Sequence, residues 1–76
     1  MTENLEQARQ AVAYALQIAP EEVADDLAFG DIPQWDSMGH MEVMLTLEER
    51  FGIEITPESI NALTSLAAIA QVLAAH

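Results

Sequence analysis

Cysteine and lysine are absent from this sequence of 76 residues, and its only basic side chains besides histidine are Arg9 and Arg50. Without cysteine, the chain can form neither a disulfide framework nor a cysteine-ligated zinc site. Thirteen acidic residues bring the formal net charge to −11. A field of this sign repels nucleic acids and anionic lipid surfaces, attracts basic partners and disfavours self-association. We therefore expect a monomer with basic protein partners and no nucleic-acid partner, although the acidity also fits a role in solubility alone.

Long apolar runs are missing as well. No stretch approaches the roughly 20 residues that a membrane helix needs, and the N-terminus lacks the basic start and apolar run of a signal peptide. We expect a cytoplasmic protein that does not insert into membranes. The length leaves room for one domain over residues 1–76, and neither a repeat nor a linker divides it. The Met1 start and a last helix that runs to His76 favour a free-standing protein over an excised module.

The sequence does contain the apolar periodicity of helices. Apolar residues recur at steps of three and four over residues 3–17, which predicts a first helix that Ile18 and Pro20 end. Residues 18–36 carry scattered apolar residues without a period, so we expect a long packed loop with one short helical turn over residues 20–24. The apolar side chains of this loop should cover the bundle: Val23, Leu27, Phe29, Ile32 and Trp35.

The second helix should begin at Asp36 or Ser37 and end at Phe51, with Gly52 as its left-handed C-cap. At about 100° per residue, its core face consists of large apolar residues: Met41, Met44, Leu47 and Phe51. Another stripe mixes apolar side chains with carboxylates: Met38, Glu42, Leu45, Glu48 and Glu49. Such a mixture is typical of a docking surface, in which apolar contacts supply burial and acids supply orientation. It also fits an ordinary solvated face.

Two shorter helices follow. Thr56 as N-cap and Pro57 in the first turn predict a short third helix over residues 57–62. Thr64 or Ser65 opens the last helix, whose apolar residues share one face: Leu66, Ile69, Ala70 and Leu73. The predicted fold class is therefore all-α: a small, irregular four-helix bundle with a long first loop, a short third helix and one crossover.

The segment QWDSMGHM places Asp36, Ser37 and His40 within five positions. A hydrolase relay needs a base that reaches the serine and a third group that orients the base. His40 instead falls toward the core, Asp36 suits the helix N-cap, and the only other histidine is His76. We therefore expect no catalytic residue and no enzyme. Ser37 suits modification, because a phosphate there would meet unpaired N–H groups and the helix dipole, and Gly39 would leave space for another protein.

A calcium-binding loop is the remaining candidate for a metal site. Asp25 and Asp36 stand at positions one and twelve of an EF-hand frame. Leu27 and Phe29 occupy positions three and five of this frame, where a calcium ion needs side-chain oxygens. We therefore predict no metal site.

The order and spacing of these features resemble the acyl carrier protein family. The triplet Asp36-Ser37-Met38 is similar to the family's Asp-Ser-Leu attachment motif, and a helix ending in LEERFGIEI follows it, then a short acidic helix and a last helix begun by Thr or Ser. The resemblance covers essentially all 76 residues. It implies that a phosphopantetheinyl transferase links 4′-phosphopantetheine from coenzyme A to Ser37. Acyl or aminoacyl groups would then be carried as thioesters on its terminal thiol, a reactive group that the cysteine-free chain lacks.

The resemblance also implies partners. The second helix would be the recognition helix for basic docking patches on an acyl- or aminoacyl-loading enzyme and on downstream synthases or transferases. The mixed stripe would form the contact: Met38, Glu42, Leu45, Glu48 and Glu49. Apolar residues of the loop over 18–36 would border the carried acyl chain, and the carrier itself would catalyse nothing.

Departures from the family pattern leave the pathway open. Fatty acid carriers usually have an acidic and a small polar residue where this chain has Gly39 and His40, and the Gly-Gly pair that often precedes the serine of peptidyl carriers is missing. The segment DSMG resembles D-alanyl carriers. We expect a carrier for a dedicated biosynthetic pathway, such as fatty acid or polyketide synthesis. An aminoacyl carrier, D-alanyl-like or peptidyl, and an unmodified acidic adaptor are the alternatives.

Overall fold

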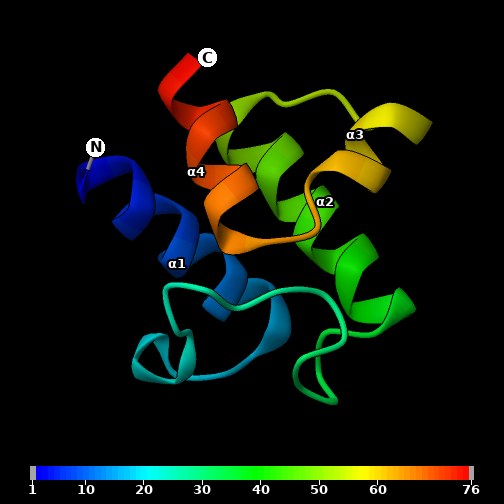
Figure 1. Cartoon of the computed structure of the whole chain (residues 1–76). Helices are drawn as coiled ribbons and strands as arrows, with labels where there is room; N and C mark the ends of the chain where they lie inside the picture. The colour runs from blue at the N-terminus through cyan, green and yellow to red at the C-terminus, as the bar shows by residue number, and fades with distance from the viewer. Residues whose placement is uncertain (1, 76) are drawn as a thin grey trace.

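The computed structural model of the chain describes residues 2–75, and the expectations that involve Met1 and His76 lie outside the described residues. Four α-helices and one short 3₁₀ helix follow one another (Figure 1): α1 (Thr2–Leu16), η1 (Pro20–Glu22), α2 (Ser37–Phe51), α3 (Pro57–Ala62) and α4 (Leu66–Ala75). Residues 2–75 contain no β-strand, only an isolated bridge between Ala28 and Ser65. The predicted all-α class with a short third helix is confirmed.

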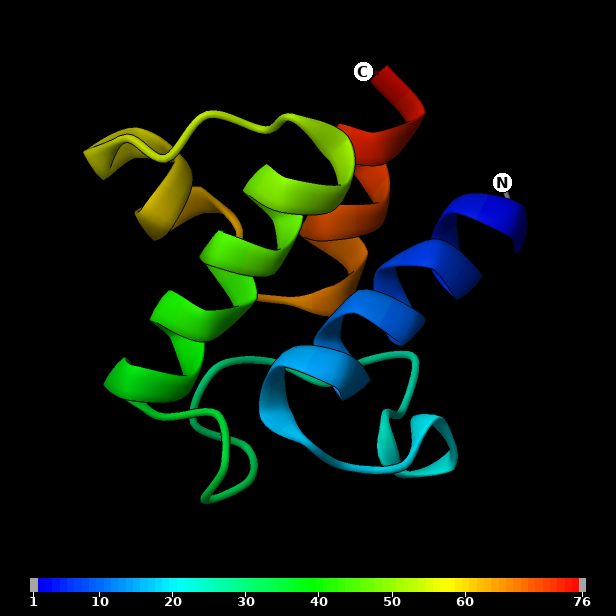
Figure 2. The ribbon, with the colours of Figure 1, turned by 180° about the vertical axis from the view of Figure 1, so that it is seen from behind.

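The core lies where α1, α2 and α4 meet, because α1 packs against both other helices. Figure 2 shows α1 and α3 on opposite sides of the bundle, with α2 and α4 between them. The three long helices all contribute fully buried side chains: Ala8, Ala11, Val12, Val43, Met44, Leu47, Leu66 and Ile69. None of the side chains of α3 is fully buried. The short helix is therefore less completely buried against the bundle than the three long helices are.

Helix α1 ends one residue earlier than the sequence predicts. Gln17 adopts a left-handed conformation with φ of 58°, and its N–H donates to the carbonyl of Tyr14. The N–H of Ile18 donates to the carbonyl of Ala13 at 3.0 Å. These two bonds form a Schellman motif, which satisfies carbonyls at the end of the helix. Its left-handed position is usually occupied by glycine.

The termini of α2 agree with the prediction. The side chain of Asp36 accepts a hydrogen bond from the N–H of Gly39 at 2.9 Å, so Asp36 is the N-cap. At the other end, Gly52 has φ of 72° and its N–H donates to the carbonyl of Glu48. Both caps consist of hydrogen bonds between residues three or four apart, and they determine where the helix starts and stops.

The predicted core face of α2 is wrong at Met41. Met44 and Leu47 are fully buried and Phe51 is half-buried, but 41% of Met41 is exposed. The buried stripe contains two residues that the prediction omits, Val43 and Thr46, and it also contains His40, which was expected to fall toward the core. Met41 faces α3, and this short helix covers it only partly. The true stripe is thus rotated away from Met41 and toward α1.

The boundaries of α3 are as predicted. Thr56 and Ser59 form a reciprocal capping box, in which each hydroxyl accepts from the other residue's N–H, and Pro57 follows the cap. Ser65 rather than Thr64 opens α4, since its hydroxyl accepts from the N–H of Ala68 at 3.1 Å.

The loop from residue 17 to residue 36 packs against the bundle. Val23, Leu27 and Trp35 are buried, Ile32 is half-buried and Phe29 is 43% exposed. Backbone hydrogen bonds tie the loop to the start of α4: Phe29 N–H to the carbonyl of Thr64, and Leu66 N–H to the carbonyl of Leu27.

Arg9 fastens the same loop to α1. Its guanidinium donates to the carbonyl of Val23 and to the carboxylate of Asp25, and also contacts Glu6 within α1. The hydrogen bond with Asp25 is the largest cause that raises the pKa of Arg9 above its ordinary value. The middle of this long loop is therefore held to α1 and to the start of α4 by polar contacts as well as by buried side chains.

Candidate functional site

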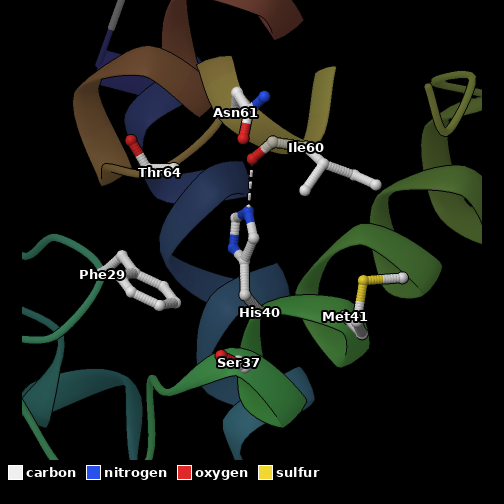
Figure 3. Close-up of a pocket in the computed structure, with 7 residues that line it drawn as sticks. All are labelled: Phe29, Ser37, His40, Met41, Ile60, Asn61 and Thr64. Carbon is white, nitrogen blue, oxygen red and sulfur yellow. Dashed lines mark hydrogen bonds between the residues drawn. The ribbon is translucent and has the colours of Figure 1, made fainter. Parts of the chain in front are cut away.

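Ser37 is the first residue of α2 and is exposed, directly after the Asp36 cap. It lies at the rim of a pocket of about 330 Å³ between the loop, α2 and α3. Figure 3 shows Ser37 at one edge of this pocket, with His40 rising from α2 toward α3. Seven residues line the pocket: Phe29, Ser37, His40, Met41, Ile60, Asn61 and Thr64. A group attached to Ser37 thus has direct access to this pocket.

The His40 imidazole is only 5% exposed, and both of its nitrogens are engaged. Trp35 Nε1–H donates to His40 Nδ1 at 3.1 Å, while His40 Nε2 lies 2.7 Å from the carbonyl oxygen of Ile60. An indole N–H can only donate and a carbonyl can only accept. The ring is therefore neutral, with its proton on Nε2. Because neither nitrogen is available to Ser37, the arrangement cannot act as a hydrolase relay.

Gly39 has an internal role that the sequence did not predict. A Cβ atom at Gly39 would overlap the backbone oxygen of Gln34 and approach Leu16 Cδ2 to 3.0 Å. The expectation that Gly39 leaves space for another protein is therefore wrong. The space is filled by the chain's own loop, which presses against the first turn of α2.

The residues around Ser37 fit a phosphate-linked group. The first turn of α2 presents backbone N–H groups that lack helical partners, and these favour a phosphate together with the helix dipole. Ser59 and Ser65, the other serines of the sequence, use their hydroxyls in the caps of α3 and α4. Ser37 is the one serine whose side chain combines exposure, a helix N-terminus and a neighbouring pocket.

The mixed stripe of α2 is exposed along its whole length. The side chain of Met38 is 80% exposed and that of Leu45 is 42% exposed. The three carboxylates of the stripe are also exposed: Glu42, Glu48 and Glu49. Arg9 is committed to the loop, and Arg50 lies 4.7 Å above the ring of Tyr14 in α1. The stripe therefore combines apolar side chains with carboxylates that neither arginine pairs with in residues 2–75.

Two acidic side chains of the loop, Asp25 and Asp31, make contacts within the chain. Asp25 pairs with Arg9, and Asp31 accepts a hydrogen bond from the N–H of Ala28 at 3.0 Å. Within residues 2–75, no three histidine or acidic side chains come together as a group that could hold a metal ion. Nor does the described part of the chain contain a helix long and apolar enough to cross a membrane.

Sequence reasoning missed the contribution of α3 to the pocket. Ile60 and Asn61 line it from α3, and Thr64 lines it from the connection to α4. No motif marks these residues, because their position depends on how α3 rests on α2. The spacing of helical signals gives the limits of α3 but not the direction in which its side chains point.

Comparison with known proteins agrees with this geometry. The model of a family described as "Phosphopantetheine attachment site" matches residues 6–73. The chain is 34% identical over 65 residues to the acyl carrier protein of Thermosynechococcus vestitus, and the aligned region covers 86% of this chain and 80% of that protein. It is 30% identical over 61 residues to the acyl carrier protein of Zymomonas mobilis, with 80% and 78% of the two chains covered. It is 33% identical over 61 residues to polyketide-8 synthase acyl carrier protein 2 of Streptomyces avermitilis, with 80% and 70% covered.

A helical bundle with an exposed serine at the start of its second long helix thus coincides with a family match over most of the sequence. The chain belongs to the acyl carrier protein family, whose members hold 4′-phosphopantetheine covalently and are carriers rather than enzymes.

Proposed function

We propose that Ser37 is the attachment residue for 4′-phosphopantetheine and that residues 1–76 act as one carrier domain for acyl intermediates. The observation that carries this proposal is the placement of Ser37: exposed, at the first position of a 15-residue helix and at the rim of a pocket. When bound, the group supplies the terminal thiol that this cysteine-free chain lacks, and the thiol carries the cargo.

The chain's own residues prepare this attachment. Asp36 caps α2 and so fixes the position at which the helix, and Ser37 with it, begins. The N–H groups of the first turn favour the negative charge of a phosphate ester at Ser37. Trp35, fully buried beside Asp36, anchors the backbone just before the serine. The hydroxyl is therefore held at a defined place on the surface for a modifying enzyme.

We further propose that the mixed stripe of α2 is the docking surface for partner enzymes, and we use this term for Met38, Glu42, Leu45, Glu48 and Glu49. Its exposure, and the absence of an arginine paired with its carboxylates within residues 2–75, support basic docking patches on a phosphopantetheinyl transferase, a loading enzyme and downstream synthases or transferases. Exposed apolar side chains beside carboxylates suit an interface in which burial gives affinity and charge gives orientation. We place this exchange in the cytoplasm, where coenzyme A supplies the arm.

We favour acyl cargo in a dedicated biosynthetic pathway over aminoacyl cargo. The relatives are named acyl carrier proteins, and one of them belongs to a polyketide synthase. An unmodified acidic adaptor would use the same docking surface without an arm, so the covalent step separates the two functions.

The proposal is tested by intact-protein mass after incubation with coenzyme A and a broad-specificity phosphopantetheinyl transferase. The wild type should gain the mass of one phosphopantetheine, and Ser37→Ala should gain nothing while keeping its helical circular dichroism spectrum. Ser65→Ala is the matched control, because it also removes a serine hydroxyl from a helix start and should be modified like the wild type. A gain in Ser37→Ala would place the arm elsewhere. No gain in any of the three with this enzyme and with a panel of other transferases would leave the adaptor function.

A further inference from the structure

We propose that His40 is a specificity-determining residue of this carrier: by holding α3 against α2, it restricts the cargo that can shelter beside Ser37 to groups that fit the existing pocket. The inference rests on the proposed attachment at Ser37. It follows from the hydrogen bonds of His40, the incomplete burial of α3 and the position of both at the pocket.

His40 connects three segments of the chain: the end of the loop, α2 and α3. From α2, its Nδ1 accepts from Trp35 in the loop, and its Nε2–H donates to Ile60 in α3. The Phe29 ring packs edge-on against the imidazole, with centroids 5.6 Å apart and planes at 78°. The ring is thus held through both of its nitrogens and by a contact with Phe29, and its two hydrogen bonds permit one tautomer only. It cannot rotate without breaking both hydrogen bonds.

The position of α3 on α2 depends on the hydrogen bond between His40 and Ile60. It has six residues and none of their side chains is fully buried. The capping box of Thr56 and Ser59 is internal to α3 and its entry, so it does not hold α3 to α2. Ile60 is among the last residues of α3, whose carbonyls lack a partner within the helix. His40 supplies that partner, and so the contact both caps α3 and fixes its place on α2.

The same contact limits the depth of the pocket. His40 and Ile60 both line it, and their hydrogen bond crosses from α2 to α3 (Figure 3). A short group can occupy the existing space of about 330 Å³ while the bond stays intact. A long chain can go deeper only if α3 separates from α2, which leaves the Nε2–H of a buried imidazole and a carbonyl without partners. Loss of one such buried hydrogen bond corresponds to a factor of about ten in an equilibrium constant.

The experiment uses arms that carry acetyl, hexanoyl or dodecanoyl groups, transferred to Ser37 from the corresponding acyl coenzyme A. Intact mass first confirms that each protein is charged. A failure at this step would count against attachment at Ser37, and only charged protein tests His40. Shelter is then measured as the rate at which hydroxylamine cleaves the thioester, relative to the same acyl group on free pantetheine. Hydrogen–deuterium exchange of the α3 amides reports separately whether α3 has left α2.

Three variants isolate the contact. His40→Leu removes both hydrogen bonds, and His40→Gln retains a side-chain donor and acceptor. Thr46→Val is the matched control: Thr46 is the other buried polar residue of α2, but its hydroxyl donates to the carbonyl of Glu42 within the same helix. In the wild type and in Thr46→Val, hexanoyl should be sheltered and dodecanoyl cleaved at about the rate on free pantetheine. His40→Leu should slow dodecanoyl cleavage by about tenfold and speed α3 exchange by a similar factor, with His40→Gln closer to the wild type.

If His40→Leu does not fold, the dodecanoyl and hexanoyl forms of the wild type still test the proposal. Shelter of dodecanoyl in the wild type, equal to that of hexanoyl and with α3 exchange unchanged, would overturn the proposal. The same conclusion would follow if Thr46→Val extended shelter to dodecanoyl as much as His40→Leu did. A simple loss of stability would speed exchange in every charged form alike and would not depend on the length of the cargo.

Discussion

Gly39 in α2 and Gln34 in the preceding loop are in such close contact that only a hydrogen atom fits between the glycine Cα and the Gln34 carbonyl oxygen. Leu16 of α1 also lies close to this point, since its Cδ2 would be 3.0 Å from a Cβ atom at residue 39. The end of the first helix, the loop and the start of α2 therefore converge two residues after Ser37. The position of the site depends on the absence of a side chain at residue 39.

Gly39→Ala tests this contact. In an open helix interior, glycine to alanine raises stability by about 1 kcal/mol. Here the added methyl group must displace the Gln34 backbone or Leu16, so we expect the free energy of unfolding to fall by about 1–3 kcal/mol. Urea denaturation measures the change. Met38→Ala at the neighbouring, 80% exposed position should change stability by less than about 0.5 kcal/mol. A Gly39→Ala protein as stable as the wild type would contradict the close contact.

Gln17→Gly should stabilise the chain. Gln17 holds the left-handed position of the Schellman motif with φ of 58°, where a side chain is unfavourable. After the greater entropy of glycine in the unfolded chain is subtracted, a gain of about 0.5–1 kcal/mol remains. Thermal unfolding of Gln17→Gly would show it as a higher Tm. The same change at Gln10, exposed in the middle of α1, should cost about 1 kcal/mol, and equal effects at both positions would argue against the motif.

Arg9→Met should loosen the loop. The carboxylates that Arg9 contacts are mostly exposed, with Asp25 at 74% and Glu6 at 56%, so these ion pairs contribute little. The part-buried bond to the Val23 carbonyl matters more, and its loss should lower stability by about 1–2 kcal/mol. Hydrogen–deuterium exchange should rise most over residues 19–25. Arg50→Met, which removes only the exposed contact with Tyr14, is the comparison, and a uniform rise in exchange along the whole chain would contradict a local tether.

Charge reversal on the docking surface should slow association with the phosphopantetheinyl transferase. Glu42→Lys combined with Glu49→Lys should lower the association rate about tenfold at low salt, and less at high salt. Surface plasmon resonance of the unmodified proteins measures this rate. Glu21→Lys combined with Asp26→Lys changes the net charge equally, but at exposed positions outside α2. If both double variants slowed binding alike, net charge rather than the docking surface would explain the attraction.

Helix limits proved predictable from the sequence wherever a short-range cap determines them. Thr56 and Pro57 gave the start of α3, and Gly52 gave the end of α2, because the relevant hydrogen bonds join residues three to five apart. The end of α1 was less clear, since Gln17 takes a conformation that its residue type seldom adopts.

Side-chain surroundings were harder to predict because they depend on the neighbouring helix. Met41 has the periodicity of a core residue, yet the short α3 leaves it 41% exposed. His40 was expected near the core, but its bond to Ile60 joins residues 20 apart in the sequence, and a helical wheel carries no such information. The crowding at Gly39 likewise comes from the loop backbone, whose path no motif encodes.

The hydrogen bond from Trp35 to His40 gives the protein a natural optical probe. Trp35 is the only tryptophan in the chain, and it is fully buried and hydrogen-bonded to His40, the residue that contacts Ile60 of α3. Its emission depends on the polarity around the indole and on the partner of its N–H group. Fluorescence of the unlabelled protein should therefore follow, in real time, any loading reaction or encounter with an enzyme that moves α3.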